Sequence, residues 1–214
     1  MATLSSKTFE TPQSLSEWLN TRLQPGSLAS WGTKPGTKNI NNLFLELSQG
    51  ESTLSDSTPP IRTVHCMVVR ILSNATNRVL LESRQDLSNG TSRPRSRPLS
   101  EKMRAGESVE EAALRAVKEE LGPSWVARVV PGTYKIKEEE REAGSFPGLM
   151  SRYVVHTVDA RVEGLPEEDF ATEEEEYKDV DGGGDGGVKG IVKEAVHVIR
   201  HHWTWANSDY VEDA

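Results

Sequence analysis

The stretch "MRAGESVEEAALRAVKEELG", residues 103–122, holds the residue types best suited to chemistry. Three of its carboxylates, Glu107, Glu119 and Glu120, lie with Arg115 on or beside one predicted helix. Several acids at one end of a helix suit a hard divalent cation, because Mg²⁺ takes oxygen ligands. The simpler alternative is a solvated helix end in which Arg115 pairs with Glu119 at i,i+4. Glu107, just before the helix, favours the metal site because it can turn back toward Arg115.

The helix that must position these groups has clear predicted ends. Ser108 and Glu111 have the spacing of a capping box, so the helix should begin near Val109. Gly122, followed by proline, predicts a left-handed cap and an end near residue 121. The small residues of the apolar face would let the helix lie close against a sheet; that face consists of Val109, Ala112, Ala113, Ala116, Val117 and Leu121.

The spacing resembles the Nudix box of the Nudix hydrolases. That motif is Gly, five residues, Glu, seven residues, Arg-Glu, an apolar residue, any residue, Glu-Glu, any residue, Gly and an apolar residue. With Glu107 on its first Glu, the positions in register are Arg115, Val117, Glu119, Glu120 and Gly122. The resemblance covers about residues 61 to 206.

This resemblance implies an activity and a set of site residues. Nudix hydrolases bind Mg²⁺ or Mn²⁺ on helix carboxylates, and the metal bridges a diphosphate while water attacks one phosphorus. The implied metal ligands are Glu119 and Glu120. Glu107 and Arg115 are implied as the supporting pair that holds loop and helix together. All four are therefore expected in the catalytic site.

Three positions depart from the motif. Glu101 replaces the opening glycine, Ala116 replaces the acid after the arginine, and Pro123 replaces the closing apolar residue. Ala116 weighs most against catalysis, because a metal carboxylate supports both charge neutralisation and an activated water. Glu101 is less damaging, since its backbone carbonyl can still face a metal.

Residues outside the box could compensate for Ala116 or bind the substrate. A further acid could come from Glu138 to Glu140 or from Glu173 to Glu176, although charge runs are usually solvated. His202, just before Trp203, is a candidate general base, although an ordinary strand histidine is the more common role. Arg95 and Arg97, in "SRPRSRP", could hold substrate phosphates through their forked donors.

The remaining pattern predicts an α+β fold. Leucines and a tryptophan at helical spacing predict a helix within residues 13–24, and residues 1–60 are expected to form an N-terminal extension of helical segments and loops. Strands are expected in "IRTVHCMVVRIL" and "NRVLLESRQ", joined as a hairpin, and in "SWVARVVPGTYKIK", "SRYVVHTVDARV" and "HVIRHHWTW". "GTSRPRSRP" and "EEEREAGSFPGLM" are expected as loops. Residues 61–214 then form one Nudix-like domain, an α/β/α sandwich around a mixed sheet, with an acidic, glycine-rich loop at about 166–190.

Composition limits the possible partners and location. The net charge is −8, and the mean hydropathy is −0.56. This acidic balance argues against DNA and against anionic membranes as partners. No apolar run approaches the roughly 18 residues that span a bilayer, and "MATLSSKTFETP" lacks the apolar segment of a secretory signal. We expect a cytoplasmic protein.

Three functions remain open. The first is a metal-dependent Nudix diphosphatase that cleaves a nucleoside diphosphate linked to a moiety X, with a small-molecule diphosphate as substrate. The second is a catalytically inactive Nudix-fold protein that binds nucleotides or RNA. The third is a protein-interaction scaffold that uses residues 1–60 and the acidic loop. The sequence names neither the substrate nor the oligomeric state.

Overall fold

The computed structural model describes residues 7–34, 36–173 and 195–208. Most of the predicted acidic, glycine-rich loop, residues 174–190, lies outside this part of the chain. The chain divides into two compact units: unit 1 takes Met1–His65, Glu138–Val154 and Gly183–Val196, and unit 2 takes Cys66–Lys137, Val155–Gly182 and His197–Ala214. Three long strands, β2 (Ile61–Ile71), β7 (Lys135–Glu142) and β8 (Met150–Val162), contribute residues to both units.

Unit 1 is built around two short helices, α1 (Pro12–Asn20) and α2 (Ile40–Ser48). Both begin with capping boxes, in which Thr11 and Asn39 accept from backbone amides three residues later. A 3-10 turn, η1 (Ser27–Ser30), lies between them, and β1 (Ser52–Leu54) pairs antiparallel with the start of β2. The apolar faces meet in one core, formed by Leu15, Leu19, Leu23, Trp31, Leu43, Leu54, Ala143, Phe146 and Leu149.

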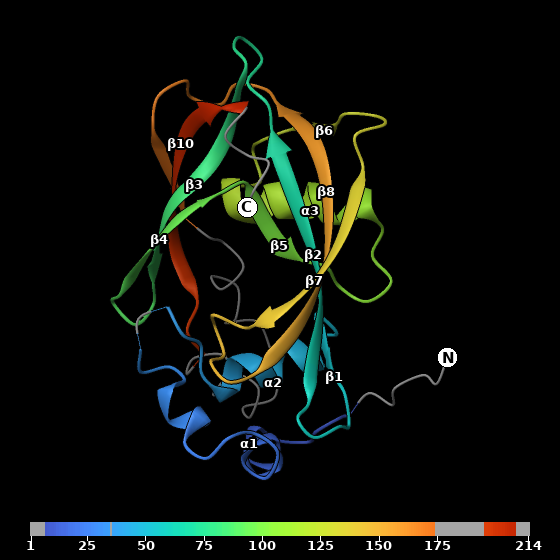
Figure 1. Cartoon of the computed structure of the whole chain (residues 1–214). Coiled ribbons are helices and arrows are strands. Elements are labelled where there is room, and N and C mark those ends of the chain that lie inside the picture. The colour runs from blue at the N-terminus through green and yellow to red at the C-terminus, as the bar shows by residue number, and fades with distance from the viewer. Residues whose placement is uncertain (1–6, 35, 174–194, 209–214) are drawn as a thin grey trace, which may run out of the picture. The chain divides into compact units, whose positions relative to one another are not determined.

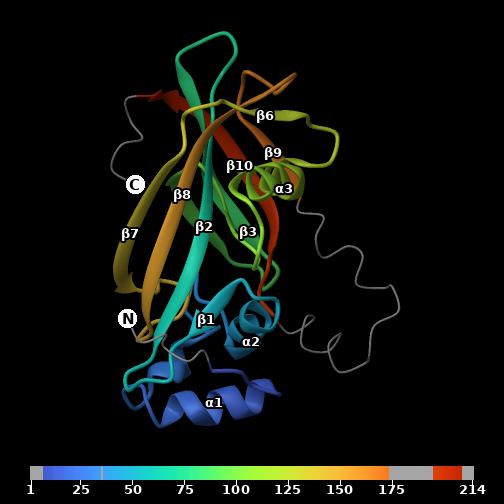
Figure 2. The same cartoon turned by 90° about the vertical axis from the view of Figure 1, so that its right-hand side faces the viewer.

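Unit 2 holds the predicted Nudix-box helix, α3 (Val109–Leu121), together with strands of two sheets. In one sheet β2 pairs with β5 (Leu99–Lys102), and β8 pairs with β6 (Ala127–Val129). The other sheet has the order β4-β3-β10-β9, with bounds Ser92–Arg97, Arg78–Leu87, Val198–Asn207 and Phe170–Glu173. Helix α3 contacts β5, β6 and β9 (Figures 1 and 2).

The apolar face of α3 is in the core of unit 2. Four small or branched residues of that face are at most 1% exposed: Ala112, Ala113, Ala116 and Val117. They pack with strand residues that include Met67, Leu99, Val158 and Trp203. The small alanines let helix and strands approach closely, so α3 is held on the sheets that supply the other site residues.

The α+β class and the helix 109–121 are confirmed, but several local predictions need correction. The expected single strand "SWVARVVPGTYKIK" is divided between β6 and the start of β7. The expected loop "GTSRPRSRP" contains strand β4, and the acidic start of the expected loop "EEEREAGSFPGLM" belongs to β7. Neither segment has the apolar alternation that marks a strand, because β4 is an edge strand that tolerates Pro94 and β7 exposes nearly all its residues.

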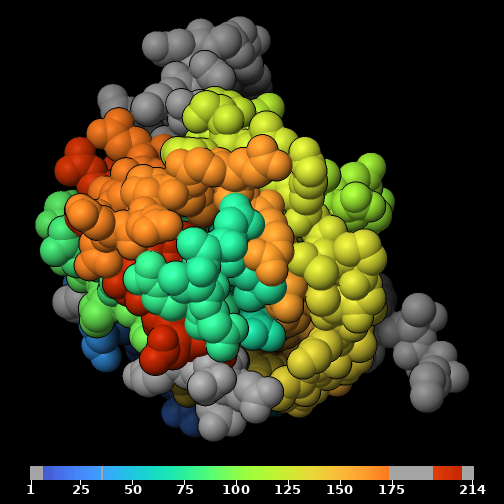
Figure 3. Space-filling model, turned by 90° about the horizontal axis from the view of Figure 1, so that it is seen from above, coloured from blue at the N-terminus to red at the C-terminus, as the bar shows by residue number. Residues whose placement is uncertain are grey.

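A further correction concerns the expected hairpin between β2 and β3. One isolated bridge joins Leu72, just after β2, to Val79 of β3, and the two strands belong to different sheets. The turn instead lies beside the end of β8 on the surface of unit 2 (Figure 3), where Asn74 Nδ2 donates to the Val162 carbonyl at 3.2 Å. Among the described helices, none is long and apolar enough to cross a bilayer.

Candidate functional site

Helix α3 begins as the sequence predicts and ends differently. Ser108 Oγ accepts from the Glu111 amide, and the Glu111 carboxylate accepts from the Ser108 amide at 2.9 Å. Gly122 ends the helix with φ +111° and ψ +156°. The φ is positive as expected, but the ψ places the residue outside the left-handed helical region, so the predicted left-handed cap is wrong. The extended backbone there turns the chain directly away from the helix.

Arg115 joins the loop before α3 to the last turn of the helix. Its Nε and Nη2 donate to the two carboxylate oxygens of Glu107 at 2.7 and 2.9 Å. Its Nη1 donates to Glu119 at 2.6 Å, and Nη2 also donates to the Lys102 carbonyl at 2.7 Å. One guanidinium therefore connects β5, the loop and the helix, which is the role expected for the supporting pair.

The charges of this network shift the three pKa values in different directions. The hydrogen bond from Arg115 lowers the pKa of Glu107, and burial opposes it only in part. Burial alone would lower the pKa of Arg115, but the hydrogen bond to Glu107 and the charge of Glu119 raise it overall. Burial raises the pKa of Glu119, and Glu101 adds to the rise while Arg115 opposes it.

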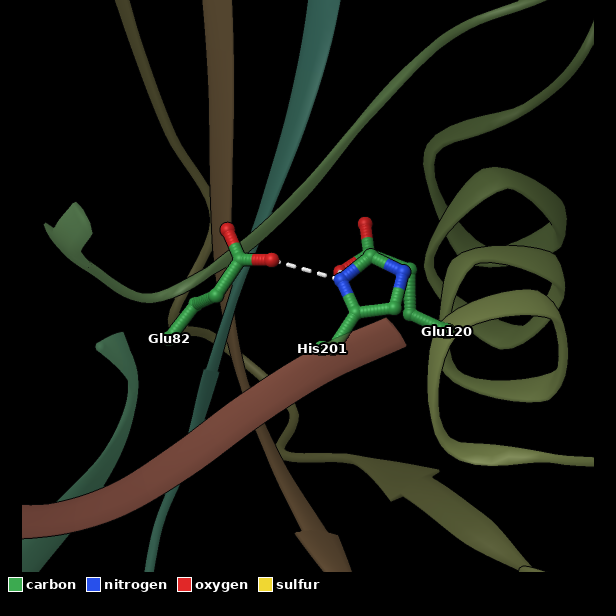
Figure 4. Close-up of side chains that lie close together, drawn as sticks. All are labelled: Glu82, Glu120 and His201. Atoms are coloured by element: carbon green, nitrogen blue, oxygen red, sulfur yellow. Dashed lines mark hydrogen bonds and ion pairs between the residues drawn. The ribbon is translucent and has the colours of Figure 1, made fainter. Parts of the chain in front are cut away.

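Glu120 belongs to a different set of contacts from its neighbour Glu119. Successive helix residues point about 100° apart, and Glu120 is 3% exposed while Glu119 binds Arg115 and Arg104 at the rim. The Glu120 carboxylate lies 3.6 Å from Nδ1 of His201. Figure 4 shows Glu82 from β3 and Glu120 from the helix both reaching the His201 ring, and both carboxylates approach its Nδ1.

His201 and Glu82 are site residues that the sequence analysis missed. Nδ1 of His201 and the Glu82 carboxylate share a hydrogen bond of 2.5 Å, and their side chains are 2% and 3% exposed. The candidate base His202 lies elsewhere: its Nε2 contacts Asp86 at 2.8 Å and Arg84 at 2.9 Å. Side chains alternate between the faces of a strand, so the two adjacent histidines of β10 point to opposite faces and contact different residues. The apolar pattern around "IRHHW" does not reveal which of them faces the helix.

The pKa of Glu82 is lowered although the side chain is buried. Burial raises the pKa of Glu82, but hydrogen bonding and charge from His201, with the charge of Arg95, lower it overall. Arg95 Nε lies 3.2 Å from the second carboxylate oxygen of Glu82. This places one of the two predicted phosphate-binding arginines directly beside the buried cluster.

Strand β4 also carries Arg97, the second arginine predicted to bind phosphate. Arg97 is the cross-strand partner of Glu82, which in turn is opposite Trp203 of β10. Cross-strand partners share a sheet face. The Nε of Arg97 is buried and, within the described residues, has no hydrogen-bond partner. A buried donor without an acceptor makes Arg97 a candidate contact for a bound anion.

Ala116 is fully buried in the core of unit 2. It lies four residues before Glu120, one turn earlier on the same helix face. The position at which the Nudix box usually has an acid is therefore part of the packed interface here. Glu101, at the departure from the opening glycine, is on β5 and its carboxylate accepts from the Lys102 amide at 2.7 Å.

The other candidate acids are exposed, engaged in surface pairs or outside the described residues, and Glu138 is exposed on β7. Glu139 and Glu140 pair with Arg141 and Arg152 of unit 1, at 3.1 and 2.7 Å. Glu173 pairs with Arg200 at 3.1 Å. Glu174 to Glu176 lie outside the described residues. These pairs are typical of solvated charges.

The donor types at the end of α3 fit a divalent cation, but unequally. Both carboxylate oxygens of Glu119 contact arginines, so metal binding there would have to replace an arginine contact. Glu120 lies among other ligand types, with Glu82 and His201 offering one ligand atom each within 4.8 Å. Glu120 is therefore the box carboxylate best placed to share a cation.

Comparisons with known proteins follow the same part of the chain. A model of the NUDIX domain matches residues 63–181. No curated protein sequence matches significantly. Two solved structures are similar: a NUDIX hydrolase from Nitrosomonas europaea, with 19% identity, 68% of this chain and 72% of that chain covered, and a TM-score of 0.37, and the E. coli dihydroneopterin triphosphate pyrophosphohydrolase, with 17% identity, 68% and 81% covered, and a TM-score of 0.33. At such TM-scores neither likeness supports a functional argument.

Proposed function

The chain belongs to the Nudix family, and on this premise we propose that it is a hydrolase that cleaves a diphosphate bond in a nucleoside diphosphate linked to a second moiety. The observation that carries the proposal is the joined set at α3, in which Arg115 binds Glu107 and Glu119 while Glu120 is buried beside two further ligand-type side chains. Carboxylates at the C-terminal end of a helix are costly without a cation nearby, because the helix dipole is negative there.

The proposed roles follow from these contacts. Glu119 and Glu120 are the proposed ligands of Mg²⁺ or Mn²⁺, which when bound neutralises phosphate charge and activates water. Glu107 accepts both hydrogen bonds of the Arg115 fork and so fixes the loop before the helix. Arg115 also holds Glu119 in position, so both residues of the pair act on the geometry of the carboxylates rather than on the substrate.

Arg95 and Arg97 are the proposed substrate-binding residues. They share the sheet face of Glu82, and Arg97 keeps a buried Nε without a partner among the described residues. A planar guanidinium can donate two parallel hydrogen bonds to a phosphate, which a lysine cannot. The diphosphate would then lie between β4 and the end of α3, within unit 2.

The proposal extends to organisation and location. Residues 61–214 are proposed as the Nudix domain, with residues 1–60 as its helical extension and a cytoplasmic site of action. The family match over residues 63–181 supports the first boundary. The net charge of −8 supports a small-molecule diphosphate, rather than DNA or a membrane, as the partner.

A cleavage screen tests the proposed activity. Dinucleotides, nucleotide sugars, capped RNA and inositol pyrophosphates are incubated with Mg²⁺ or Mn²⁺, and the phosphorylated products, such as a nucleoside monophosphate, are identified. Glu120→Gln should lower kcat/KM about 100-fold or more, because several kcal/mol of charge stabilisation is lost. Glu163→Gln is the matched control, since Glu163 is 68% exposed and pairs only loosely with Arg128 at 3.4 Å.

Absence of turnover would support the second candidate function. Ala116 in the packed core is the observation that favours it, because the usual acid is replaced by a buried apolar contact. The protein would then bind a nucleotide or RNA through the same arginines without cleaving it. Equilibrium binding of the screened compounds by a protein that cleaves none of them would establish this alternative and exclude the hydrolase.

A further inference from the structure

The described residues contain one buried group of three metal-binding side chains, Glu82, Glu120 and His201, from three different elements. Strand β3 supplies the first, helix α3 the second and strand β10 the third (Figure 4). Their side chains are 2–4% exposed. We propose that these three residues form a binding site for a divalent transition-metal ion such as Mn²⁺, Co²⁺ or Zn²⁺.

The ligand types select the class of metal. Imidazole nitrogen together with two carboxylates suits Zn²⁺, Mn²⁺, Fe²⁺ and Co²⁺, whereas Mg²⁺ binds almost wholly through oxygen. This set differs from an all-carboxylate box because one of its donors is a histidine from a distant strand. The site depends on the proposed hydrolase only through Glu120, which the two ligand sets share.

The distances are close to those of a metal site. Nδ1 of His201 lies 2.5 Å from Glu82 and 3.6 Å from Glu120, and all three ligand atoms lie within 4.8 Å of one another. Bonds of about 2.0–2.2 Å to a tetrahedral ion place two ligand atoms about 3.3–3.6 Å apart. The Glu120 contact already has that spacing, and the Glu82 carboxylate would move about 1 Å from Nδ1 as the ion replaces their hydrogen bond.

The surrounding contacts hold the ligands in place. Arg95 binds the other oxygen of Glu82 at 3.2 Å. The His201 ring stacks on Trp203 with centroids 5.6 Å apart, and Trp203 Nε1 donates to Thr172 at 2.8 Å. Thr172 Oγ1 donates to the backbone carbonyl of Glu120. Such outer contacts orient ligands and raise metal affinity.

The site also supplies ligands that could replace the acid missing at Ala116. The helix lacks a carboxylate one turn before Glu120, and the sheet facing the end of the helix supplies Glu82 and His201 instead. Three protein ligands leave coordination positions open for water or a phosphate oxygen. The neighbouring arginines of β4 would meet an anion bound there.

Metal binding to the full chain, stripped with chelator, tests the proposal without any substrate. Calorimetry should show one Mn²⁺ or Zn²⁺ bound per chain, and thermal melting should show a rise in Tm with each metal. His201→Asn places an amide group where Nδ1 lies. It should weaken binding of Mn²⁺ and of Zn²⁺ at least 10-fold, while the affinity for Mg²⁺ changes less than 3-fold. Glu82→Gln, which is nearly identical in shape to the parent, should weaken binding of Mn²⁺ and Zn²⁺ similarly. Co²⁺ absorption should lose intensity or shift in His201→Asn, because a nitrogen ligand is removed.

His202→Asn is the matched control, because His202 contacts Asp86 and Arg84 rather than the cluster. It should bind metals like the parent. Equal metal affinity in the parent, His201→Asn and Glu82→Gln would overturn the proposal, as would absence of Mn²⁺ and Zn²⁺ binding by the parent. Cleavage of the screened compounds with Mg²⁺ is measured separately, so failure of the proposed hydrolase and failure of this metal site are distinguishable.

Discussion

At the scale of single residues, Arg115 and Glu120 have different roles at the end of α3. Arg115 uses its donors to join Glu107, Glu119 and the Lys102 carbonyl, and so fixes the loop. Glu120 points instead into the buried cluster with Glu82 and His201. The two adjacent glutamates of "EE" therefore belong to different networks, because one helix position rotates a side chain by about 100°.

Glu107→Gln should change how stability depends on pH. The folded-state pKa of Glu107 is lowered below its ordinary 4.5 by the hydrogen bond from Arg115. Its contribution is therefore fully present above pH 4.5 and is lost as pH falls through the lower folded-state value. Removing it should cost about 1.5–3 kcal/mol at neutral pH. In urea unfolding from pH 7 to pH 3, the difference between parent and variant should shrink below pH 4.5. A difference that stays constant would contradict the assignment.

Ala116→Glu should be strongly destabilising without metal and partly rescued by it. The new carboxylate would be buried one turn before Glu120, where an unpaired charge costs several kcal/mol. A saturating divalent cation would share the added charge and recover part of that loss. Thermal melting with and without Mn²⁺ measures both the destabilisation and its recovery by the metal.

Ala112→Glu is the control for that change, since Ala112 is equally buried but lies two turns from Glu120. Its destabilisation should be the same with and without Mn²⁺. Equal rescue of both variants by the metal would show that Ala116 has no connection with a cation site. Turnover that rises in Ala116→Glu alone would show a weakened enzyme.

Arg97→Gln should raise KM about 10- to 100-fold, because one charged hydrogen bond to a phosphate is worth about 1.5–3 kcal/mol. The effect on kcat should be small if Arg97 binds the part of the substrate that does not react. Arg128→Gln is the control, because Arg128 is 75% exposed and away from β4 on strand β6. Steady-state kinetics on the substrate found in the screen measures both, and an unchanged KM in Arg97→Gln would remove Arg97 from the site.

At the scale of elements, α3 and β10 decide the geometry of the site. The capping box starts the helix at Val109 and Gly122 stops it at Leu121, so Glu120 is always in the last turn. Strand β10 pairs with β3 and β9 at once, with an irregularity between His202 and Trp203. This pairing presents His201 to the helix and His202 to Asp86.

Gly122→Ala should destabilise the protein by about 1–3 kcal/mol, because φ +111° with ψ +156° is open essentially to glycine alone. Space is not the reason, since an added Cβ would lie 3.9 Å from Trp125. Gly144→Ala is the control: its φ lies outside the range that side chains rarely adopt, and no atom lies within 4 Å of its added Cβ. Urea unfolding should separate the two, and equal stability of both variants would contradict a conformational requirement at Gly122.

At the scale of the whole molecule, charge sets the range of partners. The net charge of −8, which agrees with a pI of about 5.3, means that the protein repels polyanions at neutral pH. A few arginines on β4 could still bind a small diphosphate. Each compact unit has its own apolar core. The candidate cation ligands and the candidate phosphate-binding arginines all belong to unit 2.

The protein should therefore bind duplex DNA and anionic vesicles more weakly than about 10⁻⁴ M at 0.15 M salt, the weak end of non-specific DNA binding. Fluorescence anisotropy with a labelled duplex and vesicle sedimentation measure the two affinities. Capped and uncapped RNA serve as the comparison. Micromolar binding of duplex DNA or vesicles with a steep salt dependence would contradict the charge argument, whereas micromolar binding of RNA would favour the RNA-binding alternative.

The sequence by itself determined the family, the helix 109–121 and the pairing of Arg115 with Glu107 and Glu119, because these depend on spacings within about twenty residues. Capping, i,i+4 contact and the motif are all local, so no knowledge of the fold is needed. Local pattern failed where strands carry little apolar alternation, as in β4 and β7, and at the turn whose strands enter two sheets.

Only the tertiary structure decided which groups meet Glu120. Glu82 and His201 lie 119 residues apart in the chain, and their pairing follows from the register of β3 with β10. A shift of that register by one residue would present His202 in place of His201, since strand side chains alternate between faces. The packing of α3 also decided that Ala116 is buried. Register and packing depend on long-range contacts, which spacing along the chain does not encode.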